Sequence, residues 1–387
     1  MKRIKRVFYN VLDLDDQPIY ISTNDNTIIA IGKMTSFDIK QYANFEQYNF
    51  FNKAYVSSGW IDIHTHCYEK QSLYTDDPDE IGVRQGVTTV IDAGSVGADA
   101  VDDFYHCKDK YQTKVYCWLN VAKIGIPFQG ELLDLNNIDE KLISQKLHQY
   151  PDFIVGLKVR MSKSVVGVNE LQPLIKTIKI QQNNNLVPVM IHIGNGPPNI
   201  NDILALTGNN VIITHAYNGK SNRIFQKDPL TIGYLNAALQ RGLKLDVGHG
   251  SESFSFAPFK WALAHKYVPD FISSDIYQKN RWDGPVYSLA NVLSKMLYFG
   301  LSLKEIIAKV TIDPATFLGF SHCGKLAVNY QADLTFFEIN QVDILATEGM
   351  QQKQGQTIKL TKEIKPVMCV VKTNIIHLGE RKYGKNK

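Results

Sequence analysis

The sequence predicts an α/β fold, a (β/α)8 TIM barrel with a small β-sandwich domain built from both chain ends. Eight short β-rich runs alternate with helix-like stretches between about residues 58 and 275. Most of these runs are almost continuously apolar, which is typical of parallel strands that are buried on both faces. Eight such alternations over roughly 250 residues match the size of a TIM barrel.

The segments between the strands carry helix-end signals. Asp77-Pro78 precedes a predicted helix over Asp79–Gln85, which Gly86 closes, and Asp228-Pro229 and Gly242 frame a second helix in the same way. A capping side chain, a first-turn proline and a terminal glycine are typical of helix ends. An open doubly wound sheet is the competing fold, but no GxGxxG or phosphate loop follows the first strand. The eight predicted strands are Trp60–His64, Thr88–Asp92, Val115–Asn120, Phe153–Lys158, Val187–His192, Val211–His215, Leu243–Val247 and Phe271–Asp275.

The two ends of the chain have a different pattern. Residues 1–55 contain alternating strands with turn signals, and Ala332–Phe337 and Val367–Lys372 are again strand-like. Neither end is long enough to bury a good core by itself. We therefore expect residues 1–55 and 324–387 to form one composite β domain beside a barrel domain of residues 56–323.

Composition is that of a globular protein with a substantial core, with 44% hydrophobic and 21% charged residues in a chain of 387. The net charge of +4, from 42 basic and 38 acidic residues, is too small to indicate nucleic acid as a partner. No apolar run suits a secretory signal or a membrane span. Five widely spaced cysteines without a CxxC pair favour free thiols in a reducing cytoplasm. These features predict a cytoplasmic protein that acts on a small molecule, and they leave room for a homo-oligomer.

Metal-ligating residue types gather at the ends of the predicted strands. His64 and His66 share one face of the first strand, because side chains at i and i+2 point the same way. Imidazole is a preferred ligand of zinc-like ions. Lys158, His192, His215 and Asp275 end four further strands, and barrel enzymes place their chemistry at the C-terminal ends of strands. Each histidine alone would more often be structural, but together they predict a metal site.

Lys158 has two interpretations. A lysine at the end of a buried strand is costly unless it is paired or neutral. One interpretation is a salt bridge to Asp275 or another carboxylate. In the other, burial beside metal cations lowers the pKa of the amine, which takes up carbon dioxide and becomes a carbamate ligand.

The run Gly59–His66, followed by Lys158, His192, His215 and Asp275, resembles the binuclear pattern of the amidohydrolase superfamily. The stretches 311–320 and 324–336 resemble the usual end of that superfamily, so the likeness covers nearly the whole chain. The resemblance implies that His64, His66 and Asp275 hold one divalent metal, zinc by expectation, and that His192 and His215 hold the other. A carbamate on Lys158 and a hydroxide would bridge the two metals, and Asp275 would shuttle the proton. The implied reaction is hydrolysis of an acyl bond, amide or ester, in a small metabolite.

Residues 81–94 and 246–250 are most similar to a bacterial branch of predicted deacetylases, often labelled dihydroorotase-like or adenine-deaminase-like. Tyr68 stands where dihydroorotase-like sites usually have a substrate-binding arginine. Ile193-Gly194-Asn195 lacks the glutamate of adenosine-type deaminases, and the deaminases labelled for adenine usually have Glu where this chain has Lys158. A deacetylase is therefore preferred, with a cyclic amide hydrolase or an adenine-deaminase-like aminohydrolase as alternatives. A non-catalytic scaffold is the alternative of another class, although all six ligand positions are filled.

Two residues are candidates for substrate contact. Arg160 shares a face with Lys158, and its guanidinium could bind a substrate carboxylate or pair with a neighbouring acid of the barrel. His249 follows the seventh strand between two glycines. It could contact substrate, support a ligand from behind, or occupy a turn.

Overall fold

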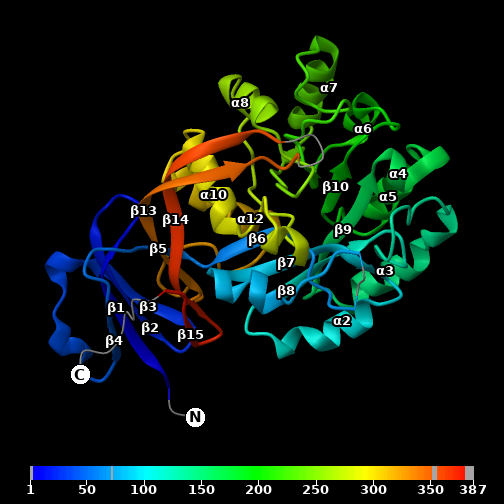
Figure 1. Ribbon diagram of the computed structural model, residues 1–387. Helices are drawn as coiled ribbons and strands as arrows, with labels where there is room; N and C mark the ends of the chain where they lie inside the picture. The colour runs from blue at the N-terminus through cyan, green and yellow to red at the C-terminus, as the bar shows by residue number, and fades with distance from the viewer. Residues whose placement is uncertain (1–2, 71–72, 351–354, 380–387) are drawn as a thin grey trace.

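The computed structural model describes residues 3–70, 73–350 and 355–379. Two sheets organise this part of the chain, one with seven parallel strands and one with eight strands of mixed direction. They lie beside each other, and helices cover the outside of the parallel sheet (Figure 1). The predicted fold class, a TIM barrel with an additional β domain, is confirmed.

The barrel sheet follows the order of the chain. Each strand pairs in parallel with the next one in sequence, from β6 to β12. Most of its residues are buried, as the apolar runs predict. The strands are β6 (Trp60–Thr65), β7 (Val87–Gly97), β8 (Lys114–Asn120), β9 (Ile154–Met161), β10 (Val189–Ile193), β11 (Val211–Thr214) and β12 (Lys244–Leu245).

The eighth barrel segment is irregular. A regular strand is predicted over Phe271–Asp275, but the structure shows only isolated parallel bridges there, Asp246 to Phe271 on one side and Thr65 to Ile276 on the other. The prediction of a regular strand is wrong because Asp275 has a left-handed φ of 51°, outside the β region. The segment nevertheless closes the barrel, since the Asp275 amide donates to the His64 carbonyl at 2.7 Å.

The helices begin where the caps predict. The Asp77 side chain caps α1, and the Asp228 carboxylate accepts from two backbone amides at the start of α7. The predicted helix Asp79–Gln85 is split at Gly82, which has φ −99° and ψ −111°, and only a 3-10 turn follows. No helix in the described ranges has the length and apolar character needed to cross a membrane. The helices are α1 (Pro78–Ile81), α2 (Val101–Cys107), α3 (Glu140–Gln149), α4 (Lys163–Val166), α5 (Gln172–Asn183), α6 (Ile200–Leu206), α7 (Pro229–Gln240), α8 (Phe256–Ala264), α9 (Gln278–Trp282), α10 (Leu289–Tyr298), α11 (Leu303–Ala308) and α12 (Ile312–Phe317).

Both ends of the chain contribute to the second sheet. Its order is β15-β14-β13-β5-β1-β2-β3, with β4 beside β1. Aromatic rings pack in its core, where the Phe336 ring stacks on Phe50 at 4.4 Å and lies tilted against Phe8 at 5.1 Å between ring centroids. The strands are β1 (Lys5–Leu12), β2 (Pro18–Asn24), β3 (Thr27–Lys33), β4 (Glu46–Asn49), β5 (Tyr55–Ser58), β13 (Leu334–Thr347), β14 (Thr357–Val371) and β15 (Asn374–His377).

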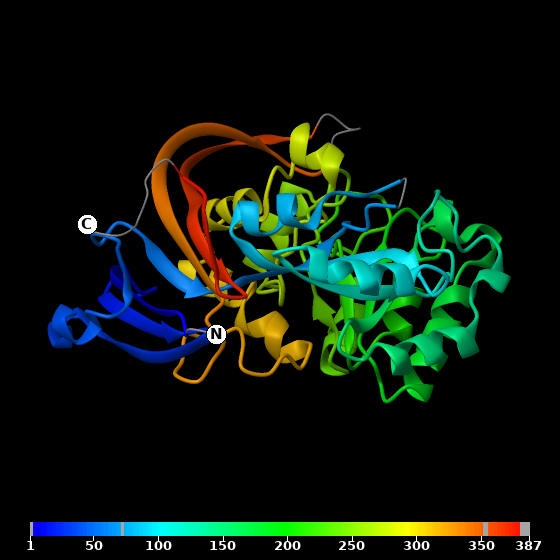
Figure 2. The ribbon, with the colours of Figure 1, turned by 90° about the horizontal axis from the view of Figure 1, so that it is seen from below.

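The β13–β14 hairpin extends far beyond the strands that the sequence predicts. Its outer half runs from the second sheet over the barrel and ends beside the loops at the barrel mouth (Figures 1 and 2). Packing on α10 supports it there, where the Ile364 amide donates to Ser294 Oγ at 2.9 Å. Residues 340–345 are mostly exposed, and their polar and apolar residues do not alternate regularly, so they lack the pattern that identifies a strand.

Candidate metal centre

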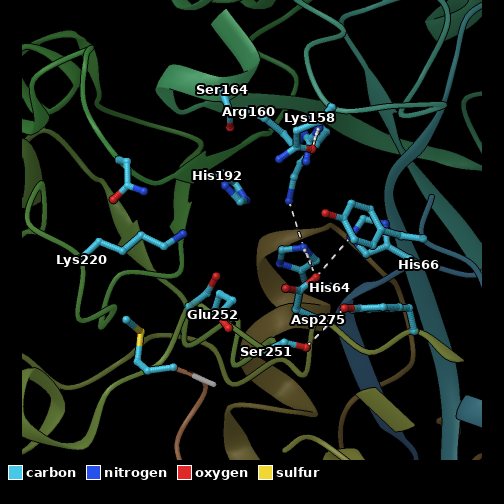
Figure 3. Close-up of a pocket in the computed structure, with 16 residues that line it drawn as sticks. His64, His66, Lys158, Arg160, Ser164, His192, Lys220, Ser251, Glu252 and Asp275 are labelled. Carbon is cyan, nitrogen blue, oxygen red and sulfur yellow. Dashed lines mark hydrogen bonds and ion pairs between the residues drawn. The ribbon is translucent and has the colours of Figure 1, made fainter. Parts of the chain in front are cut away.

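Three of the predicted ligands converge at the barrel mouth. Nε2 of His64 and Nε2 of His66 each lie 3.2 Å from Oδ1 of Asp275. All three ligand atoms lie within 4.8 Å of one another (Figure 3). Two imidazole nitrogens and one carboxylate oxygen form a donor set that suits a zinc-like divalent ion.

The imidazole rings are held from behind so that Nε2 faces the centre. The carbonyl of Gly248 lies 2.6 Å from Nδ1 of His215. A carbonyl only accepts, so Nδ1 carries the proton and Nε2 keeps its lone pair. Oγ1 of Thr214 lies 2.8 Å from Nδ1 of His64 and donates to Oδ2 of Asp246 at 2.7 Å. The same protonation of His64 follows, because this hydroxyl proton is already committed. Partners of this kind fix the tautomer of a metal-binding histidine.

His192 and His215 form the second pair of predicted ligands. Their ring centroids are 4.5 Å apart, and the His215 ring lies 5.0 Å from that of His64. Burial lowers the pKa of His215 to about 3 and the pKa values of His64 and His192 well below their usual range. These imidazoles are therefore neutral at physiological pH, the state in which they bind metal.

Lys158 projects from β9 into the same cluster. Its Nζ lies 3.2 Å from Nε2 of His64 and 3.2 Å from Sδ of Met190. The ion pairs of Asp275 run to histidines, so a direct Lys158–Asp275 salt bridge is not what holds the amine here. Burial lowers the pKa of Lys158 to about 7. A β-carbon at Gly94 would lie 2.8 Å from Cβ of Lys158, so glycine provides the room for this side chain.

Backbone strain marks two of the ligands. His215 and Asp275 have left-handed φ values of 61° and 51°. Such conformations cost on the order of 1–3 kcal/mol each in non-glycine residues and persist where the surrounding structure imposes them. Gly250 packs against one of them, since a β-carbon there would lie 2.3 Å from Oδ2 of Asp275. The Gly-His-Gly sequence after β12 is therefore required for close packing against the site.

Two buried carboxylates lie beneath the ligands. Asp246 accepts from Ser273 as well as from Thr214, and Asp62 accepts from both the amide and the hydroxyl of Ser274. Burial raises the pKa of Asp62 to about 7 and that of Asp246 to about 6. These residues anchor β6, β11 and the eighth segment to one another at the level of the ligands.

Arg160 is paired with an acid. Its Nε lies 2.6 Å from Oε1 of Glu131 and its Nη2 lies 2.7 Å from Oε2, while Gln129 accepts from Nη2 at 3.0 Å. Of the two interpretations of Arg160, the structure shows the ion pair, although the acid comes from the β8–α3 loop. Arg160 still lines the pocket, but its charge is balanced by Glu131.

His249 is fully buried and is not among the residues that line the pocket. Its Nδ1 lies 2.9 Å from the carbonyl of Gly250 and its Nε2 lies 2.9 Å from Nζ of Lys295. These contacts favour the supporting role over direct contact with substrate, because the ring faces an interior lysine.

The ligands open into a cavity of about 330 Å³. The volume is at the lower end of the range for small-molecule sites. Lys220 lies across the pocket from His66 and Asp275 (Figure 3). Several lining residues were not predicted from the sequence, because they come from loops or, for Ser164, from the short helix α4, and carry no local signal: Tyr74, Gln129, Ser164, Asn195, Lys220, Ser251, Glu252, Ser253, Tyr277 and Met350.

Comparison with known proteins agrees with this geometry. A profile of the amidohydrolase family matches residues 254–380. A deacetylase from Enterococcus faecalis is 38% identical over 359 residues, which cover 92% of this chain and 95% of that protein. A deacetylase from Agrobacterium fabrum is 30% identical over 322 residues, covering 82% and 78%.

Solved structures show the same architecture. The crystal structure of an adenine deaminase is similar with a TM-score of 0.90 and 36% identity, covering 97% of this chain and all of that one. The crystal structure of a dihydroorotase has a TM-score of 0.87 and 28% identity, covering 96% and 97%.

Proposed function

The chain belongs to the amidohydrolase family, and on that premise we propose that it is a binuclear deacetylase of small, carboxylate-bearing metabolites. The family match and the deacetylase relatives support a metal-dependent hydrolase that cleaves amide bonds. The observation that carries the proposal is the convergence of the Nε2 atoms of His64 and His66 on Asp275 in a small polar cavity.

The residues present fit two divalent ions. His64, His66 and Asp275 would hold one ion, His192 and His215 the other, and a carbamate on Lys158 would join them. The anchored Nδ1 atoms and the neutral imidazoles support this assignment. When bound, the ions, zinc by our proposal, supply a hydroxide nucleophile at neutral pH and polarise the scissile carbonyl.

The low pKa of Lys158 supports the carbamate. Carbamate formation joins the neutral amine nitrogen to the carbon of carbon dioxide, and one proton leaves the nitrogen. An amine with a pKa of about 7 is partly neutral at physiological pH, whereas an ordinary lysine is almost fully protonated. The carbamate is an anion, so it suits a place between two cations.

Asp275 is the residue we assign to proton transfer. Its carboxylate lies at the pocket surface of the cluster, with 16% of the side chain exposed, whereas the side chains of His64 and His215 are almost completely buried. It can therefore reach both the nucleophile and a leaving group. A positioned acid–base group of this kind contributes about 10²–10⁴ in rate.

The substrate carboxylate is assigned to Lys220 rather than to Arg160. The Arg160 guanidinium is turned toward Glu131, and Lys220 lines the pocket across from Asp275 (Figure 3). A substrate with its acyl carbon at the ligands and its carboxylate near Lys220 would span the cavity. N-acylated amino acids and O-acylated hydroxy acids are small molecules of that form.

Ring-opening of a cyclic amide and deamination of adenine remain the competing reactions, since the two similar structures carry those names. Tyr68 cannot replace a substrate-binding arginine, because its hydroxyl donates to Asp103 at 2.9 Å and it does not line the pocket. A non-catalytic scaffold is disfavoured by the complete, converging donor set.

The test is a substrate panel with metal analysis. The protein reconstituted with zinc and bicarbonate is assayed on acetylated amino acids and hydroxy acids, with dihydroorotate and adenine in parallel. We expect about two equivalents of metal per chain, hydrolysis of an acetylated acid, and loss of activity in Asp275→Asn. Turnover of only the ring substrates would overturn the deacetylase assignment, and absence of bound metal after reconstitution would favour the scaffold.

A further inference from the structure

The β13–β14 hairpin forms part of the pocket wall. After Thr347, the last residue of β13, the chain reaches Met350, which lines the cavity and is only 4% exposed. The hairpin belongs to the sheet built from both chain ends (Figures 1 and 2). Through Met350, the segment that follows β13 contributes directly to the pocket.

Glu348 fastens the hairpin to the start of α8. Its Oε2 accepts from the amide of Phe256 at 2.7 Å and from Oγ of Ser255 at 3.1 Å. The side chain is almost completely buried, and the start of a helix favours a negative charge. This contact determines where the hairpin ends relative to the barrel loops.

Gly349 lies against the loop that supports Asp275. Its carbonyl accepts from the amide of Phe254 at 3.2 Å, and a β-carbon at Gly349 would lie 2.5 Å from the carbonyl oxygen of Gly250. Gly250 in turn packs on the carboxylate of Asp275. The hairpin therefore packs on the Gly250 loop, and this loop packs on the metal ligand Asp275.

Lys295 of α10 binds both the end of β13 and the loop that contains His249. Its Nζ is fully buried and donates to Nε2 of His249 at 2.9 Å, the carbonyl of Pro285 at 2.7 Å and the carbonyl of Thr347 at 2.9 Å. An ammonium group has three protons, so each one has an acceptor. Lys295 therefore connects β13 with the loops that follow β12 and the eighth segment.

Met350 closes the side of the pocket near Lys220. Its Cε lies 3.4 Å from where a β-carbon of Gly219 would stand, and Lys220 is the next residue. Lys220 lies across the pocket from His66 (Figure 3). Met350 is thus a flexible apolar side chain at the end of the cavity that is remote from His66, among mostly polar lining residues.

We propose that Met350 is a specificity-determining residue that limits the length of the substrate portion pointing away from the metal ligands, and that Glu348 and Lys295 are positioning residues for it. The inference rests on the proposed hydrolase function and adds that this site selects substrates by their length. It follows from the anchored approach of the hairpin and the position of Met350 at the remote end of a cavity of about 330 Å³.

The test measures kcat/KM on two homologous series with the metal-loaded enzyme. One series lengthens the acyl chain on a fixed amino acid, and the other lengthens the amino-acid side chain under a fixed acetyl group. Met350→Ala should shift the preferred length by one or two methylenes in one series, changing the ratio of long to short homologue by about tenfold or more. Met350→Leu keeps a similar volume and should retain the wild-type ratio.

The positioning role is tested with a matched pair. Both hydrogen bonds of Glu348 use one oxygen, so Glu348→Gln can preserve them and should retain the wild-type length preference. Glu348→Ala loses both and should move the preference in the direction of Met350→Ala. A role in stability alone would lower Tm in Glu348→Ala and leave the preference unchanged, and Lys295→Met provides the second test at the other anchor.

The outcomes separate the two proposals. Metal content is measured for every variant, so that lost metal is not mistaken for altered selectivity. If the wild type hydrolyses neither series, the proposed function fails and this inference falls with it. If the wild type is active and Met350→Ala keeps the wild-type length ratio, the inference about Met350 is overturned while the proposed function stands.

Discussion

Thr214→Val is expected to weaken metal binding without touching a ligand. The Thr214 hydroxyl accepts from His64 Nδ1 at 2.8 Å and donates to Asp246 Oδ2 at 2.7 Å. Valine has nearly the same shape but neither function, so the imidazole loses the group that fixes its tautomer and ring orientation. Both atoms are completely buried, and no solvent can replace the hydroxyl.

The magnitude follows from the role of such partners. Removing a group that orients a metal-binding histidine typically costs about 10–100-fold in metal affinity. At roughly 1.4 kcal/mol per tenfold change, this corresponds to about 1.4–2.8 kcal/mol. Asp246 keeps its bond from Ser273 at 2.6 Å, so the carboxylate remains partly satisfied and the fold should survive.

The assay is zinc affinity by competition with a chromophoric chelator, with Tm of the metal-free protein measured beside it. Thr177→Val is the matched control, because Thr177 is equally buried but its hydroxyl only bonds the Pro173 carbonyl within α5. We expect the control to bind zinc as the wild type does. An affinity of Thr214→Val within twofold of the control would refute the reasoning.

Four further outcomes are expected. Glu131→Ala should lower stability by about 3–5 kcal/mol, because the guanidinium of Arg160 is left buried without its acid, and chemical denaturation against Glu131→Gln measures this. Lys220→Met should raise KM for carboxylated substrates about tenfold or more and leave their neutral amide analogues unaffected; equal effects on both would contradict its assignment. Burial lowers the pKa of Lys158 to about 7, so the fraction of Lys158 in the neutral amine form rises with pH up to about that value. At fixed dissolved carbon dioxide, the rate of metal reloading should therefore rise about tenfold per pH unit below pH 7 and level off above it. A reloading rate that does not change with pH would argue against carbamate formation. Chelation should lower Tm and zinc with bicarbonate should restore it, because metal binds only the folded chain, whereas an unchanged Tm would speak against a resident metal.

The sequence was sufficient for the fold class because the relevant signals are local. Apolar runs mark the barrel strands, and capped starts such as Asp228-Pro229 mark helices between them. Since parallel strands all end at one edge, a histidine at the end of β10 and another after β11 had to meet. The i, i+2 spacing of His64 and His66 likewise put both rings on one face.

The failures have a common physical cause. The eighth segment has the apolar composition of a strand, but Asp275 has a left-handed φ and its amide bonds the His64 carbonyl of β6. In the same segment, the Ser274 amide donates to Asp62, which lies 212 positions away in the chain. No local pattern contains such a contact.

Local sequence patterns were enough to identify the alternation of strands and helices in the barrel and the chemical types of the six groups at the strand ends. Three features depend on how distant parts of the chain pack: Glu131 neutralises Arg160, His249 faces Lys295 rather than the cavity, and Met350 reaches the pocket from the segment after β13. The reason is that periodicity encodes which face of an element is buried, whereas pairing between loops depends on how distant elements pack.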